Sequence, residues 1–248
     1  MRISLITVSY NACVDLEQTI GSVTEQTWDD LEYIVVDGGS KDGSLEMLEK
    51  YRDCIGKLKS EPDKGIYDAI NKGLGMAEGE VVGLLHAGDR FANPHILEKV
   101  AALFEEKEAD VVYGDLQYVT SFEPIKVFRN WESGVFATSL VKKGWMPPHP
   151  TVYFRRELMD RVGLFDISFR ISADYDWLLR VMTLSGVKMV YLPEVMILMS
   201  TGGASNRSLG NIIRKSCEDY KALRKNRAGG LFTLIGKNLS KLGQFFAR

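Results

Sequence analysis

Four groups of acidic residues could do chemistry in this sequence: three follow strand-like runs, and the fourth opens a predicted helix. The first is Asp37, which ends the run Glu32–Asp37 and precedes Gly38, Gly39 and Ser40. A carboxylate at that place can accept hydrogen bonds from a ribose or a base, and the glycines let a nucleotide approach the backbone. A capped turn between a strand and a helix is the alternative, and spacing alone does not separate the two.

The second group also follows a strand-like run and opens a helix. It places Asp63 and Lys64 side by side, with Lys72 two turns further along. A helix start offers free N–H groups and the positive end of a dipole, which suit an anionic ligand, and either lysine could neutralise phosphate charge. A solvated loop and helix face would give the same pattern, so this group is open to both interpretations.

The third group is a single acid, Asp89, which follows the apolar run Val81–His86 after Ala87 and Gly88. Mg²⁺ favours carboxylate and phosphate oxygens and often takes only one or two protein ligands. Asp89 alone can therefore anchor a metal diphosphate. A capping role in the turn is the alternative.

The fourth group is the pair Asp174 and Asp176, at the start of a predicted helix, Ala173–Leu184. Residues two apart on a helix do not share a face, so only one of them can point into a crevice. A carboxylate there could act as general base for an incoming hydroxyl group. Capping of the helix N-terminus by acids is the competing explanation.

Alternating strands and helices must position these acids. The predicted strands of the first 120 residues are Ile3–Val8, Glu32–Asp37, Lys57–Ser60, Val81–His86 and Asp110–Tyr113. The predicted helices are Cys13–Gln26, Gly43–Arg52, Ile66–Glu78 and Pro94–Lys107. Repeated βα units indicate an α/β protein with a mostly parallel, doubly wound sheet, whose ligand crevice lies at the carboxyl ends of the strands.

The second half is less regular. The stretch Ser121–Pro150 is rich in aromatic residues, Gly and Pro, and we expect long loops that cover one face of the sheet there. After it the sequence predicts a strand, two helices and a strand, at Thr151–Phe154, Arg156–Val162, Ala173–Leu184 and Lys188–Leu192. We expect the main domain to close near Ser205, so that residues 1–205 form one domain and residues 206–248 form C-terminal helices.

The C-terminal segment differs in charge from the rest of the chain. The whole chain has a net charge of −2, but from Arg207 to Arg248 five Arg and five Lys face two acids. This asymmetry indicates an anionic surface as partner. A helix is predicted at Arg207–Arg227, and Leu231–Phe246 predicts a basic amphipathic helix of the kind that can lie in a lipid interface. Packing on the domain or on a second subunit, as in a homodimer, stays open. Nucleic acid is disfavoured because the apolar positions would contact phosphates poorly.

Composition sets the remaining limits. The chain has 248 residues, of which 45% are hydrophobic and 26% charged, as in globular proteins. Its three cysteines lack the spacing of a disulfide framework or a zinc site. No signal peptide and no run near the roughly 20 apolar residues of a membrane span is evident. We therefore expect a cytoplasmic protein.

Taken in order, the four groups resemble the family 2 glycosyltransferases with the GT-A (nucleotide-diphospho-sugar transferase) fold. The most similar branch is the one involved in colanic acid-like exopolysaccharide and O-antigen synthesis. The resemblance spans roughly Ile3 to Ser205. Four motifs carry it: Thr7-Val8-Ser9-Tyr10-Asn11, Val36-Asp37-Gly38-Gly39-Ser40-Lys41-Asp42-Gly43, Gly65-Ile66-Tyr67-Asp68-Ala69-Ile70-Asn71-Lys72-Gly73 and Ser172-Ala173-Asp174-Tyr175.

The resemblance implies roles for individual residues. Asp174 would be the catalytic base, and Asp89 would hold Mn²⁺ or Mg²⁺. His149 and Asp176 would be weaker candidates for contact with the acceptor or the diphosphate. The nucleotide-sugar would be bound by Thr7, Val8, Tyr10, Asp37, Gly39, Asp63, Lys64, Tyr67, Asn71, Ala87 and Gly88. Two glycines depart from the wider family pattern, since Gly38 and Gly88 stand where many members carry acids.

The function that the resemblance implies is inverting transfer of a sugar from a nucleotide diphosphate-sugar, with UDP-sugars favoured, to a hydroxyl group. The acceptor would be a lipid-linked saccharide of bacterial surface polysaccharide synthesis, met at the inner face of the cell membrane. The alternative is a non-catalytic, membrane-associated scaffold, against which Asp37, Asp89 and Asp174 argue. A dinucleotide site is excluded because the glycines at Gly73–Gly79 do not follow the first strand. An enzyme that makes sugar nucleotides would need a glycine-rich, basic loop after that strand. This chain has Ser9-Tyr10-Asn11-Ala12 there, which counts against that function.

Overall fold

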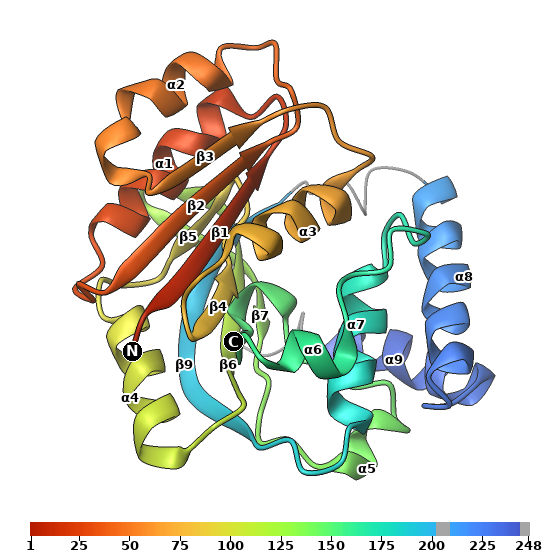
Figure 1. Cartoon of the computed structure of the whole chain (residues 1–248). Helices are drawn as coiled ribbons and strands as arrows, with labels where there is room; N and C mark the ends of the chain where they lie inside the picture. The colour runs from red at the N-terminus through yellow and green to blue at the C-terminus, as the bar shows by residue number, and fades with distance from the viewer. Residues whose placement is uncertain (202–208, 244–248) are drawn as a thin grey trace.

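The computed structural model describes residues 1–201 and 209–243. Within these ranges a nine-stranded mixed sheet has helices on both faces (Figure 1). The strand order is β3-β2-β1-β4-β8-β6-β9-β5, and β7 pairs with β6 outside this path. The strands are β1 (Ile3–Ser9), β2 (Leu31–Asp37), β3 (Lys57–Ser60), β4 (Val81–Leu84), β5 (Asp89–Phe91), β6 (Val111–Phe122), β7 (Ile125–Trp131), β8 (Tyr153–Arg155) and β9 (Met189–Ser200).

The N-terminal half of the sheet is parallel, as the repeated βα units predicted. Strands β1, β2, β3 and β4 run in the same direction, and their carboxyl ends lie at one edge. The register pairs Ser9 with Asp37 and Asp37 with Ser60, so these polar residues lie next to one another at that edge. This confirms the α/β class, and the ligand crevice expected at this edge stays a prediction.

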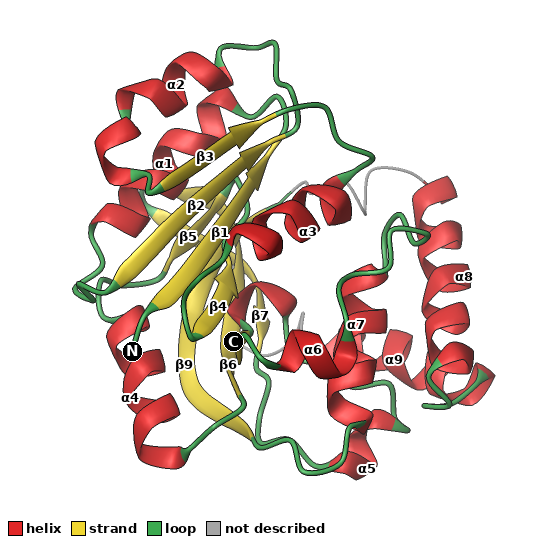
Figure 2. Ribbon diagram, viewed as in Figure 1, coloured by secondary structure: helices red, strands yellow, loops and turns green. Residues whose placement is uncertain are grey.

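The C-terminal half of the sheet is mixed. Strand β8 is antiparallel to both β4 and β6, and β5 is antiparallel to β9. The expectation of irregular loops from Ser121 onward was wrong at its start, because β6 continues to Phe122 and turns into β7 (Figure 2). The apolar residues of β7 are mostly exposed, with Ile125 at 54% and Phe128 at 56%. The strand therefore lacks the pattern of alternating burial that predicts a strand from sequence.

Strand β9 also extends beyond its predicted end at Leu192. Pro193 follows that predicted end, and a proline normally limits a strand. The pairing of β9 with β6 shifts register between Tyr113 and Asp115, which leaves Pro193 outside the regular ladder. Beyond the irregularity the strand resumes and reaches Ser200.

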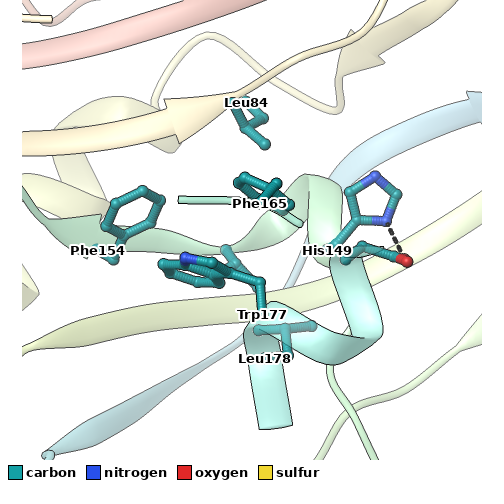
Figure 3. A pocket seen from close by; sticks show the side chains of 8 residues that line it. Leu84, His149, Phe154, Phe165, Trp177 and Leu178 are labelled. Atoms are coloured by element: carbon teal, nitrogen blue, oxygen red, sulfur yellow. Dashed lines mark ion pairs between the residues drawn. The ribbon is translucent and has the colours of Figure 1, made fainter. Parts of the chain in front are cut away.

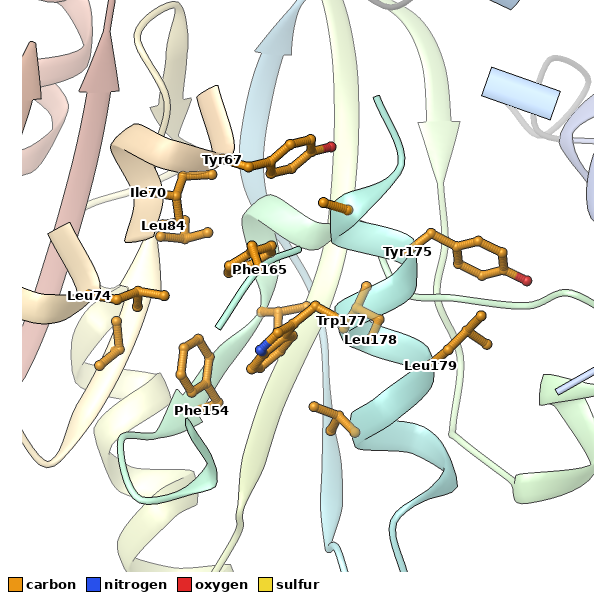
Figure 4. Packing of buried hydrophobic residues seen from close by; sticks show 14 of the residues in the cluster. Tyr67, Ile70, Leu74, Leu84, Phe154, Phe165, Tyr175, Trp177, Leu178 and Leu179 are labelled. Carbon is orange, nitrogen blue, oxygen red and sulfur yellow. The ribbon is translucent and has the colours of Figure 1, made fainter. Parts of the chain in front are cut away.

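The helices cover the two faces of the sheet in two sets. Helices α1 (Cys13–Thr24), α2 (Ser44–Lys50) and α4 (Ile96–Lys107) contribute to one hydrophobic cluster. Helices α3 (Ile66–Met76), α6 (Leu158–Val162) and α7 (Ala173–Thr183) contribute to the other, and the short helix α5 spans Thr138–Val141. In the second cluster the ring of Trp177 stacks on Phe165 at 5.4 Å and contacts Phe154 at 4.6 Å, which fixes α7 against the sheet (Figure 4).

The C-terminal helices pack on the domain through both apolar and polar residues, since Ala222 and Leu223 are buried in the hydrophobic cluster that also holds α7. Helix α8 (Leu209–Lys225) lies beside α7, and α9 (Leu231–Gly243) contacts α8 (Figure 1). Lys237 of α9 is 2% exposed and forms an ion pair of 2.9 Å with Asp219 of α8. The apolar residues of α9 face outward instead, since Leu231 is 60% and Phe232 89% exposed.

Two expectations about this region lie beyond what the structure describes. The predicted boundary near Ser205 and the apolar positions Phe245 and Phe246 fall outside the described residues. Among the helices that are described, none is long and apolar enough to cross a membrane.

Candidate functional site

Asp37 holds the turn at the carboxyl edge of β2. It is fully buried, and its carboxylate accepts hydrogen bonds from the backbone N–H groups of Gly39 (3.0 Å) and Ser40 (2.9 Å). The hydroxyl groups of Ser9, Ser40 and Ser60 donate to it as well. Burial acts to raise the pKa of Asp37, but these hydrogen bonds outweigh it and leave the pKa below its usual value. Five donors thus hold the carboxylate of Asp37 within the turn, and its predicted contact with a nucleotide stays a prediction.

Asp63 places its carboxylate beside Gly38, the position of the turn after β2 that carries no acid. A Cβ atom at Gly38 would collide with Oδ2 of Asp63 and would lie 3.2 Å from the ring of Tyr10. The other oxygen of Asp63 accepts a hydrogen bond from the N–H of Gly65 at 2.8 Å. Tyr10 is 65% exposed. The carboxylate of Asp63 thus occupies the space of a side chain at position 38, beside an exposed aromatic ring.

The first-strand motif contributes both backbone groups and side chains. Thr7 is buried, and its hydroxyl accepts a hydrogen bond from Tyr33 at 3.0 Å; its predicted contact with the nucleotide-sugar stays a prediction. The carbonyl of Val8 accepts from the N–H of Ala87 at 3.3 Å. The N–H of Gly88 donates to Thr19 at 3.0 Å.

Asp89 is the only candidate metal ligand that the sequence offered at this edge. Asp89 is 4% exposed, and Oδ2 of its carboxylate has no hydrogen-bond partner among the described residues. Burial raises the pKa of Asp89 well above its usual value, and the nearby Asp15 adds to the rise. Within the described residues no three His, Cys, Asp or Glu side chains are grouped so as to hold a metal. The chain thus fits a metal only through one carboxylate, with phosphate oxygens as further ligands.

Asp174 begins α7 and meets two other elements. Its Oδ2 lies 3.3 Å from Nδ1 of His149, shown by the dashed line in Figure 3. Its Oδ1 lies 3.2 Å from the hydroxyl of Tyr67, which also lies 2.6 Å from the carbonyl oxygen of Ile171. Burial raises the pKa of Tyr67 well above its usual value, and Asp174 adds to this, so the phenol keeps its proton and donates. Tyr67, predicted to bind the nucleotide-sugar, thus lies beside the predicted base, and its contact with the donor stays a prediction.

His86 extends this group and was missed as a site residue by sequence reasoning. Its Nε2 lies 3.1 Å from Nε2 of His149, and the two rings lie 5.2 Å apart. It directly precedes Ala87-Gly88-Asp89 in the sequence, which was the available signal. His86, His149 and Asp174 come from three separate elements, and only the fold brings them together.

Two further predicted site residues have structural roles. The side-chain amide of Asn71 donates to the carbonyl of Phe165 at 2.8 Å and accepts from its N–H at 3.0 Å, so both of its polar atoms are used. Asp176 is fully buried and binds Lys225 and Asn226 of the α8 end at 3.1 and 2.9 Å. Both side chains thus hold parts of the fold together, and their predicted contacts with donor, acceptor or diphosphate stay predictions. Lys64 is exposed and its side chain stays a candidate.

A carboxylate of α8 holds the segment in front of Asp174. The side chain of Glu218 accepts hydrogen bonds from the backbone N–H groups of Arg170 (3.1 Å), Ile171 (2.8 Å) and Ser172 (3.0 Å). A negative charge at the start of α7 is also favoured by the helix dipole. Glu218 carried no signal in the sequence, because its partners are backbone groups 46 to 48 residues away.

Comparison with known proteins agrees with this geometry. The family model described as "Glycosyl transferase family 2" matches residues 4–163. An uncharacterized glycosyltransferase of Mycobacterium tuberculosis (strain CDC 1551 / Oshkosh) is 31% identical over 184 residues, covering 72% of this chain and 68% of the relative. The chain belongs to glycosyl transferase family 2. It is a glycosyltransferase.

Further relatives of this glycosyltransferase have more specific names. The PGL/p-HBAD biosynthesis glycosyltransferase of Mycobacterium bovis (strain BCG / Pasteur 1173P2) is 29% identical over 209 residues, covering 82% of this chain and 78% of the relative. The structure of Staphylococcus aureus TarS 1-349 in complex with UDP-GlcNAc is similar with a TM-score of 0.72 and 19% identity, over 91% of this chain and 65% of that one.

A second solved structure is similar over nearly the whole chain. The mannosyltransferase PcManGT from Pyrobaculum calidifontis, in complex with GDP-Man and Mn²⁺, gives a TM-score of 0.68 at 18% identity and covers 99% of this chain and 73% of that one. Together these structures confirm the GT-A fold of the glycosyltransferase. Its membership of the colanic acid and O-antigen branch stays a prediction.

Proposed function

We propose that this glycosyltransferase transfers a sugar, with inversion, from a nucleoside diphosphate-sugar to a hydroxyl group of a lipid-linked saccharide in bacterial surface polysaccharide synthesis. The observation that supports the chemistry best is the placement of Asp174. It begins a buried helix, and two neutral donors, Tyr67 and His149, hold its carboxylate in one orientation. A carboxylate oriented in this way is suited to accept a proton from a hydroxyl group.

The proposed step is a single displacement. Asp174 takes the proton of the acceptor hydroxyl while the acceptor oxygen attacks the anomeric carbon from the face opposite the diphosphate. The new glycosidic bond forms as the bond from the anomeric carbon to the diphosphate oxygen breaks, and the nucleoside diphosphate leaves. Attack from the opposite face inverts the configuration of the sugar.

The donor nucleotide is proposed to lie against Tyr10 and Asp63. The exposed ring of Tyr10 can stack on a base, and the carboxylate of Asp63 can accept hydrogen bonds from base or ribose. Lys64, next in the chain and exposed, can reach a phosphate. UDP-sugars are favoured by the family resemblance, and the similar TarS structure holds UDP-GlcNAc.

A divalent metal, Mn²⁺ or Mg²⁺, is part of this proposal. Asp89 would hold it through the buried oxygen that has no partner among the described residues. When bound, such an ion neutralises charge on the diphosphate and so stabilises the leaving group. The similar PcManGT structure contains Mn²⁺ together with its donor.

Peripheral binding to the inner face of the membrane is proposed from helix α9. Leu231, Phe232, Ile235 and Leu239 are all at least 45% exposed and lie on one side of the helix, while Lys237 faces the protein. An apolar side turned away from the protein, in a segment with eight more positive than negative charges, fits an anionic bilayer. A second subunit is the competing partner for this face.

The membrane proposal is tested with the double variant Leu231→Ser/Phe232→Ser. We expect loss of co-sedimentation with vesicles that contain phosphatidylglycerol, whereas Ile125→Ser, which removes an apolar side chain on β7 that is 54% exposed, should bind as the native protein does. Unchanged vesicle binding by the double variant, together with conversion of a dimer to a monomer, would show that α9 forms a subunit interface instead.

Release of nucleoside diphosphate from a panel of UDP-, GDP- and dTDP-sugars, with membrane lipid extract as acceptor, tests the catalytic proposal. Asp174→Asn should still bind the donor diphosphate in a thermal-shift assay but release product at least a thousand times more slowly than the native enzyme, roughly the loss when an essential triad member is removed. If Asp174→Asn retains turnover, Asp174 is not the base.

A further inference from the structure

A row of three side chains runs from the proposed base into the protein interior. Asp174 contacts Nδ1 of His149 at 3.3 Å, and Nε2 of His149 contacts Nε2 of His86 at 3.1 Å. On the far side of His86, Nδ1 is buried and has no hydrogen-bond partner among the described residues. The row therefore ends at His86.

One arrangement of protons on the two rings suits both contacts. A carboxylate only accepts hydrogen bonds, so the tautomer of His149 that suits its 3.3 Å approach to Asp174 carries the proton on Nδ1. A neutral His149 then has its lone pair on Nε2, and His86 must donate to it from its own Nε2. The lone pair of His86 falls on the buried Nδ1, where an unmatched acceptor costs less than an unmatched N–H group would.

The surroundings keep both imidazoles neutral. Burial lowers the pKa of His86 to about 3, and the neighbouring His149 adds to the lowering. Burial also lowers the pKa of His149; Asp174 opposes this effect and Lys215 of α8 reinforces it. A neutral His149 cannot serve as a second base on its Asp174 side, because Nδ1 already holds a proton.

We propose that His149 is a positioning residue for Asp174 and that His86 acts by fixing the tautomer of His149. This rests on the proposed role of Asp174 as the base. His149 holds Oδ2 from one side and Tyr67 holds Oδ1 from the other, so the carboxylate cannot rotate about its terminal bond. The remaining lone pairs then keep a fixed direction toward the incoming hydroxyl group.

A carboxylate held in this way speeds the proton transfer without strengthening donor binding. Substitution of His149 should therefore change kcat and leave KM for the donor nearly unchanged. A histidine that only fills space would not distinguish between substitutions of similar size. His149→Asn keeps a side-chain N–H donor, whereas His149→Leu keeps the volume and loses the donor.

The experiment compares these two variants with Asp174→Asn by steady-state kinetics of nucleoside diphosphate release, with melting temperature as the control for folding. We expect His149→Leu to lower kcat about 10- to 100-fold, as removal of orienting partners does at other sites. Donor KM should change less than about threefold, and His149→Asn should recover most of kcat. Equal kcat values in His149→Leu and His149→Asn would overturn the proposal.

His86 is tested by a double-mutant cycle. His86→Leu should lower kcat in the native background, because His149 can then take the wrong tautomer. In the His149→Asn background it should have no further effect, since an amide has no tautomer to fix. Equal effects in both backgrounds would refute the tautomer role, and this result remains available if His149→Leu does not fold. Full activity of all histidine variants with an inactive Asp174→Asn would refute this inference and leave the base intact; turnover by Asp174→Asn would instead refute the proposed function.

Discussion

The clamp between Glu218 and the start of α7 gives the most direct test of how this fold supports its base. In the variant Glu218→Ala, the backbone N–H groups of Arg170, Ile171 and Ser172 lose their common acceptor. A hydrogen bond to a charged group contributes about 1.5–3 kcal/mol when its donor is otherwise unsatisfied. Arg170 is exposed, so its N–H group can bond to water instead. We therefore count only the N–H groups of Ile171 and Ser172, and only part of the contribution of each.

The expected loss of stability is therefore about 2–3 kcal/mol. For a protein of this size each kcal/mol lowers the melting temperature by about 2–4 °C, so a decrease of roughly 5–10 °C should be seen by differential scanning calorimetry. The substitution should affect catalysis more than donor binding. Glu218 holds Ile171, and the hydroxyl of Tyr67 contacts both the carbonyl of Ile171 and the carboxylate of Asp174, so a shift of Ile171 reaches the base. We expect kcat to fall about tenfold and the affinity for nucleoside diphosphate to stay the same.

The matched control is Cys217→Ala, which alters the adjacent exposed residue of the same helix without touching the clamp. Glu218→Gln should lie between the native enzyme and Glu218→Ala, because an amide keeps one acceptor oxygen and loses the charge. The reasoning would be refuted if Glu218→Ala had the same melting temperature and the same kcat as Cys217→Ala.

The remaining predictions concern the donor side. Because burial raises the pKa of Asp89, its stabilising contribution is complete below the usual pKa of Asp and is lost as the pH rises through the raised value. Asp89→Asn should therefore melt at a higher temperature than the native enzyme at pH 8, with the difference shrinking as the pH falls, and a lower melting temperature at pH 8 would contradict this. The same variant should lose any Mn²⁺-dependent thermal shift with nucleoside diphosphate. Gly38→Asp should weaken nucleoside diphosphate binding about tenfold or more in calorimetric titration, because the new carboxylate collides with that of Asp63 and repels it. Binding should return in Gly38→Asp/Asp63→Gly, and failure of this double variant to bind would count against a shared position for the two acids.

The parallel half of the sheet and the ends of its strands could be predicted from sequence because the signals are local. β-branched runs that end in Asp37 or before Asp89 identify both a strand and the edge at which it stops. The direction of a polar side chain is not local, however. Thr7, Asn71 and Asp176 were predicted to meet a ligand, and nothing in the sequence indicated that each also forms a hydrogen bond with a residue at least 26 positions away.

The same limitation explains what the sequence did not reveal about the base. His86 lies 63 residues from His149, and Glu218 lies 46 residues from Ser172, so neither partnership leaves a pattern of spacing. The β7 hairpin was missed for a different reason. Its apolar residues face solvent, and a strand without a buried face has no alternation of apolar and polar residues to detect.

The order of the functional residues along the chain has a consequence for recombining this enzyme with its relatives. The residues proposed for donor and metal all precede residue 90, and the base with its Glu218 clamp follows residue 170. A crossover near Gly163, where an exposed turn ends α6, would exchange the base half and keep the donor half. Three pairings of the site span that junction: Tyr67 with Asp174, Asn71 with Phe165 and His149 with Asp174. Chimeras should fold and turn over only when both parents supply compatible partners at these three positions.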